Sequence, residues 1–146
     1  MENKRPAYDP SEAAAALADI DRDQRAVRDT PWPIWLYPVN VVLLVALGLS
    51  FLVPEPAGMP VTLVVAGSVI AANLLAGRAN GAPFALPTSR VFLGLVALSA
   101  LLLVAAMMAA HDLDNPVGNV ACSVAAGLVY AVACVVHHRS TRGGAA

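Results

Sequence analysis

The side chains that could do chemistry lie near the ends of long apolar runs. His111, Asp112 and Asp114 lie close together and offer imidazole and carboxylate groups, which bind cations. The same positions suit helix ends, because a histidine is favourable at a helix C-terminus and Asp114 or Asn115 before Pro116 is a typical N-cap. We therefore predict helix caps here, with a bound cation as the alternative.

A cysteine pair in the last apolar run and a histidine pair just after it give no stronger sign of a site. His137 and His138 are helical neighbours that point about 100° apart, which suits joint chelation poorly. We expect both to anchor the chain at the membrane surface. Cys122 and Cys134 are separated by about 18 Å along a helix, too far for a disulfide. We predict no catalytic constellation, metal or cofactor, because ionisable residues are missing from the interior of every apolar run.

Three asparagines fall inside apolar runs. An antiparallel hairpin would bring Asn40 and Asn73 to similar depth, so we expect them near one another. Such an amide pair ties two membrane helices together by about 1 kcal/mol, and a ligand or ion contact is the alternative. Asn119 lies near the outer end of its run and is expected to meet water.

Small residues recur at helical spacing in two runs. Gly118, Cys122 and Ala126 follow one another every four residues, as do Gly67 and Ala71. Small residues at this spacing let helix backbones approach closely in a membrane. We predict that they pack within one chain, and dimerisation is the alternative.

The elements that carry these residues are predicted from the hydropathy pattern. Of the 146 residues 58% are hydrophobic and 13% are charged, whereas soluble domains carry about 25% charged residues. The apolar residues form four uncharged runs close to the length of about 20 residues that spans a bilayer. We place the spans at 34–53, 60–76, 91–110 and 117–136. The predicted fold is all-α, a membrane bundle of four transmembrane helices within residues 31–137.

The positions of the basic residues predict the orientation. All nine Lys and Arg precede the first run, flank the loop between the second and third, or follow the fourth. By the positive-inside rule both termini of this multi-pass protein of the plasma membrane are cytoplasmic. Trp32, Trp35 and Tyr37 are expected to anchor the first helix at the membrane surface. The acidic excess before residue 31 argues against nucleic acid as a partner.

Two cytoplasmic tails complete the predicted organisation. Residues 1–30 contain an amphipathic helix at about 10–29, with Asp9 as the cap, Pro10 at the first helical position and Glu12 in the first turn. Ala13, Leu17 and Ile20 line one side of it, which lies along the membrane surface or docks another protein. Residues 138–146 are predicted to be a flexible tail.

The tail helix AAAALADIDRDQRAVRDT and the Trp-rich corner PWPIWLYPV, followed by four apolar runs, resemble small uncharacterised membrane proteins of actinobacteria. The resemblance covers mainly residues 11–45. It implies the same topology and a bacterial membrane, and it carries no assigned activity. Length and helix count are also similar to small four-helix multidrug exporters. The carboxylate that those exporters keep in their first helix is missing here, where the run has Pro38 and Asn40.

Two functions fit this pattern. The first is a non-enzymatic accessory or interaction subunit that lies in the lipid bilayer and binds a membrane protein through the tail helix or a small-residue face. The second is a small oligomeric transporter or channel for a lipophilic solute, formed by self-association around four polar residues of the runs, namely Asn40, Ser68, Asn73 and Tyr130.

Overall fold

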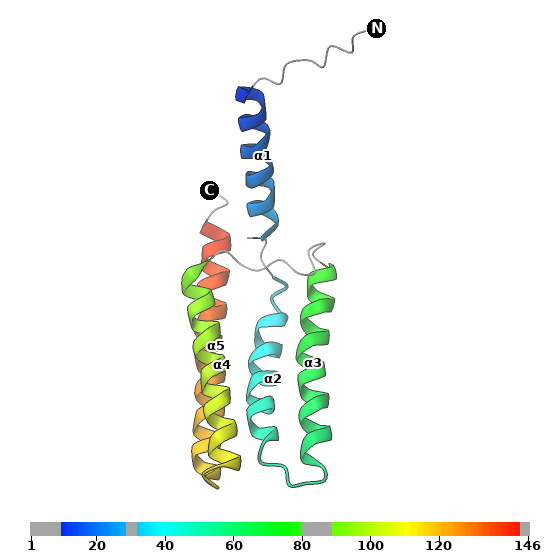
Figure 1. Cartoon of the computed structure of the whole chain (residues 1–146), viewed down its shortest axis with the longest axis vertical. Helices are drawn as coiled ribbons and strands as arrows, with labels where there is room; N and C mark the ends of the chain where they lie inside the picture. The colour runs from blue at the N-terminus through cyan, green and yellow to red at the C-terminus, as the bar shows by residue number, and fades with distance from the viewer. Residues whose placement is uncertain (1–9, 29–31, 80–88, 144–146) are drawn as a thin grey trace.

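The computed structural model describes residues 10–28, 32–79 and 89–143, and side chains are described except at 24–28 and 142–143. Within these ranges the chain forms helices joined by short turns and contains no strand. The helices are α1 (Pro10–Arg28), α2 (Leu36–Ser50), α3 (Gly58–Ala79), α4 (Arg90–His111) and α5 (Pro116–Gly143), shown in Figure 1. The predicted all-α class is confirmed for the described ranges.

Three of these helices, α3, α4 and α5, are long and apolar enough to cross a membrane. The predicted first span, 34–53, is shorter in the structure. Its helix α2 has 15 residues and is about 22 Å long, against a hydrocarbon core of about 30 Å. Turns follow Ser50 instead of helix, because Pro54 disfavours the helical conformation in the preceding residue.

Side-chain caps define where α4 and α5 begin. The Ser89 hydroxyl accepts a hydrogen bond from the Phe92 backbone N–H at 3.3 Å, and the Asn115 side-chain oxygen accepts one from Gly118 N–H at 2.9 Å. The predicted cap before Pro116 is therefore confirmed at Asn115. Asp114 instead has a φ of 46° in the tight turn that precedes the cap.

Both outer parts of the chain are helical. α1 matches the predicted helix at 10–29, although its expected cap, Asp9, lies outside the described residues. α5 continues to Gly143, so the tail predicted to be flexible from residue 138 is helical over 138–143. No proline or glycine lies between Gly127 and Gly143, and the Ser140 and Thr141 hydroxyls donate to the His137 carbonyl within the last turns.

The helices do not close into a ring of four. α4 and α5 form an antiparallel pair, and α2 packs on α5 and α3 and touches α4 (Figure 1). α3 contacts α2 alone, and α1 contacts none of the other helices. The expected bundle is therefore an open arrangement with α3 at one edge. α1 extends beyond the end at which α5 finishes.

Two glycines allow α2 and α5 to approach closely. A Cβ atom at Gly48 would overlap the Ser123 side chain, and one at Gly127 would overlap Val45. Neither glycine is among the small residues singled out from the sequence. α2 and α5 are therefore in close contact at these two positions, next to buried Ala126.

We predict that Gly48→Ala destabilises the fold by about 1–3 kcal/mol, the usual cost of forcing a methyl group into a packed contact. Unfolding in mixed micelles, titrated with dodecyl sulfate and followed by circular dichroism, measures the change. The control is Gly67→Ala, since nothing lies within 4 Å of the added Cβ there. Equal unfolding midpoints for the two variants would contradict the close packing of α2 on α5.

Candidate functional site

Asn40 is the centre of a hydrogen-bonded group that joins three helices. From α2, its amide nitrogen donates to Asn73 Oδ1 on α3 at 3.1 Å and to Tyr130 Oη on α5 at 3.2 Å. Asn73 returns a bond to Asn40 Oδ1 at 3.0 Å and donates to its own Val69 carbonyl at 2.8 Å. The predicted proximity of the two amides is confirmed, and both N–H groups of each amide are used in this group.

Asn119 forms a second junction of three helices, at the opposite end of the bundle. From α5 its amide donates to the Gly48 carbonyl of α2 at 3.0 Å and to the Ala106 carbonyl of α4 at 2.9 Å. The side chain is 0% exposed, so the expectation that it meets water is wrong. Within the described part of the chain, Asn119 Oδ1 has no hydrogen-bond partner.

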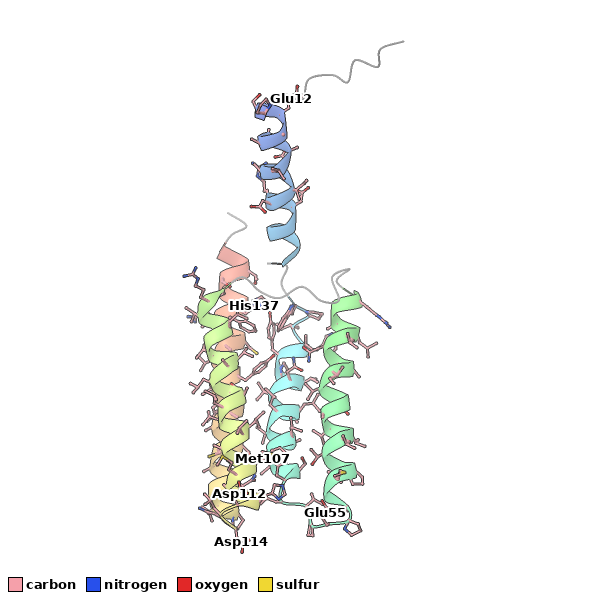
Figure 2. The ribbon with its side chains drawn as sticks, in the orientation of Figure 1. Glu12, Glu55, Met107, Asp112, Asp114 and His137 are labelled. Carbon is pink, nitrogen blue, oxygen red and sulfur yellow. The ribbon has the colours of Figure 1, made fainter. Side chains whose placement is uncertain are left out.

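Aromatic rings pack together at the end of the bundle nearest α1. The Trp32 ring lies 4.7 Å from the His137 ring, 5.6 Å from Phe92 and 6.2 Å from Tyr37, measured between centroids. His137 is buried inside this group (Figure 2), which corrects its expected place at the membrane surface. Of the three predicted anchors only Trp35 is exposed, while Trp32 and Tyr37 hold α2 against α4 and α5.

The predicted small-residue positions differ in what they contact. Ala126 is buried between helices, while Gly118 and Cys122 are half-buried, with Gly118 beside Asn115 and Ala109. Gly67 and Ala71 on α3 are exposed, and a Cβ atom at Gly67 would meet nothing within 4 Å. The stripe on α5 thus contributes to packing within the chain, whereas the stripe on α3 does not.

The buried polar groups of the two junctions and the aromatic cluster contribute to the packing of the helices. The buried polar side chains are amides, hydroxyls and one imidazole, and they bond or pack between helices. Over the described ranges no three His, Cys, Asp or Glu side chains come close enough to hold a metal ion.

Comparison of the chain with protein-family models, with curated proteins and with solved structures gave no match. Any function therefore has to be inferred from surfaces and cavities of this chain.

The asparagine pair is expected to be energetically coupled. In a double-mutant cycle, Asn40→Leu and Asn73→Leu should show a coupling energy of about 0.6–1.7 kcal/mol, between the mean and the maximum measured for hydrogen bonds between membrane helices. Dodecyl sulfate unfolding supplies the four stabilities. Pairing Asn40→Leu with Ser68→Ala is the control, because Ser68 donates to the Val64 carbonyl of its own helix. A coupling energy of zero between Asn40 and Asn73 would contradict the hydrogen bonds that join α2 to α3.

Asn119→Leu should cost about 1 kcal/mol of stability, because two hydrogen bonds between helices are lost at a mean of about 0.6 kcal/mol each. The same unfolding assay measures it. A side chain in contact with water could be replaced by leucine without loss of stability. An unchanged unfolding midpoint for Asn119→Leu would therefore restore the expectation that Asn119 meets water.

Proposed function

We propose that this protein is a non-enzymatic accessory subunit that binds another membrane protein through α1. One observation carries the proposal, which is that α1 presents exposed apolar side chains and, within the described residues, contacts no other helix. Leu17 is 67% exposed and Ile20 is 52% exposed. Most of the stability of a helix in a protein comes from packing of its apolar side, so a partner that covers this side would stabilise α1.

The two sides of α1 differ in chemistry. Ala13, Leu17 and Ile20 follow at spacings of four and three and so share one side. The Arg22 guanidinium pairs with Asp19 at 2.9 Å on the other side. Because α1 carries acidic and basic residues in similar number, it has little attraction for anionic lipid. An amphipathic helix of this kind fits an apolar groove of a protein.

α3 offers a second surface for the same partner. It contacts α2 alone, and Gly67 and Ala71 leave a smooth strip on its outward side, next to exposed Val64 and Ile70. In lipid, close packing at small residues is a main source of helix association. A transmembrane helix of the partner can therefore approach α3 along this strip.

The use of polar groups inside the bundle supports this role over transport. Asn40, Asn73 and Tyr130 bond to one another, and Ser68 bonds to its own helix. These are the residues around which a solute path would be built. Since the hydrogen bonds of Asn40, Asn73 and Tyr130 hold helices together and that of Ser68 stays within α3, these residues favour a packing role and a non-enzymatic protein.

For the topology we propose four crossings, with α2 as a short one, and both termini in the cytoplasm of a bacterium. The support is the distribution of charge. Arg78 ends α3, Arg90 begins α4 and Arg139 lies near the end of α5, so all three fall at the end that α1 leaves. Cytoplasmic ends of membrane helices are the ones enriched in arginine and lysine. The kinship with actinobacterial membrane proteins stays a prediction.

The experiment compares three tagged forms of the full chain, extracted from membranes in mild detergent. We expect wild type and Ala15→Asp to copurify a stoichiometric partner, and Leu17→Asp/Ile20→Asp to lose most of it. A carboxylate on the apolar side would be desolvated in the complex, whereas Ala15 lies on the opposite side of α1. Quantitative mass spectrometry gives the ratio of partner to chain.

Equal partner ratios in the three forms would remove α1 from the interaction. A homo-oligomer with no second protein, measured by light scattering, would overturn the accessory role. Solute flux through vesicles containing the pure chain would favour the transport hypothesis instead.

A further inference from the structure

A cavity of about 220 Å³ lies at the end of the bundle opposite α1. It exists because α3 and α4 do not touch, so α2 is left uncovered between them. Apolar side chains make up most of its walls, namely Phe51, Val53, Met59, Leu63 and Met107. Methionine adapts its shape to different ligands, which makes it common at surfaces that bind apolar molecules.

The polar groups of the cavity divide into two kinds. Ser50 Oγ donates to the Leu47 carbonyl at 2.7 Å and lies 2.9 Å from Thr62 Oγ1, so the two hydroxyls bond each other and tie α2 to α3. Glu55 and His111 line the cavity without such a role. The Glu55 carboxylate lies beside Gly58 at the start of α3, and the His111 ring is 6.2 Å from the Phe51 ring.

The charge around the cavity is negative. Glu55, Asp112 and Asp114 all lie at this end of the molecule (Figure 2), and the sequence has no Lys or Arg between residues 29 and 77 or between 91 and 138. A cation near the cavity therefore meets carboxylates and no opposing arginine or lysine. Within the described ranges these acids are not grouped for a metal ion. The cavity volume also fits a small molecule better than a bare ion.

We propose that this cavity binds a small organic ammonium cation that carries an apolar group. The ammonium lies against the Glu55 carboxylate and the face of Phe51, because aromatic rings attract cations. The apolar group fills the space between Met59, Leu63 and Met107. The proposal is independent of any partner on α1, since the cavity is lined by α2, α3, α4 and the turn between α2 and α3, and by no described residue of α1.

Binding of benzyltrimethylammonium to the full chain in non-ionic maltoside micelles, at about 0.15 M salt, tests the proposal by equilibrium dialysis. Wild type should show saturable binding at one site per chain. Glu55→Gln should weaken it about fivefold, the upper range for an exposed ion pair. Leu63→Trp, at an exposed position of the cavity wall, should abolish it by filling the space. Benzenesulfonate, an anion of similar shape, should not bind saturably.

Met108→Trp is the matched control, because Met108 is exposed beside Met107 and does not line the cavity. It should bind like wild type. If Leu63→Trp failed to fold, as judged by circular dichroism, Met59→Trp would fill the cavity from the neighbouring turn. Absence of saturable binding to wild type, equal affinity of wild type and Leu63→Trp, or saturable binding of benzenesulfonate would each overturn the proposal.

Discussion

Helices in a lipid environment gain little from apolar contact with one another, so hydrogen bonds between them and close backbone contact decide which helices meet. Over the described residues these bonds centre on two asparagines, with a further bond between the Ser50 and Thr62 hydroxyls. Asn40 joins α2 to α3 and α5, and Asn119 joins α5 to α2 and α4. The two junctions share α2 and α5, which explains why these helices form the centre. α3 takes part in one junction only and is otherwise held by the hydrogen bond between the Ser50 and Thr62 hydroxyls. It therefore lies at the edge.

The central position of α2 and α5 and the edge position of α3 determine which helix surfaces stay uncovered. α2 is short and is covered on two sides, by α3 and by the α4–α5 pair, and the third side between α3 and α4 is open. The open side ends in the cavity near Glu55, while the outward side of α3 keeps its small residues exposed. The proposed second partner surface on α3 and the proposed ligand cavity thus follow from the same feature, namely that four helices of unequal length are not packed into a ring.

The sequence predicts some of this well. Uncharged runs locate the helices, and the antiparallel hairpin between the first two runs is enough to bring Asn40 and Asn73 together. The sequence places Asn119 wrongly, because its short distance from the end of the run indicates contact with water, whereas α2 and α4 bury it. Gly48, Gly127 and the ring cluster around His137 were missed for the same reason. Each is defined by contacts between helices, and a single run shows no periodicity that distinguishes them. α2 is short because of Pro54. The prediction followed the hydropathy pattern, which continues to residue 53, and gave this local signal too little weight.

The length of α5 has a practical consequence for imaging. Its 28 residues extend about 42 Å as one helix, which is longer than a hydrocarbon core of about 30 Å. A chain of 15.0 kDa gives weak contrast in electron microscopy. A carrier protein joined in helical register after Gly143 would continue the same axis, so particle orientation could be determined from the larger body. The junction lies beyond the aromatic cluster, on the far side of the molecule from the cavity near Glu55, and would leave that cavity accessible.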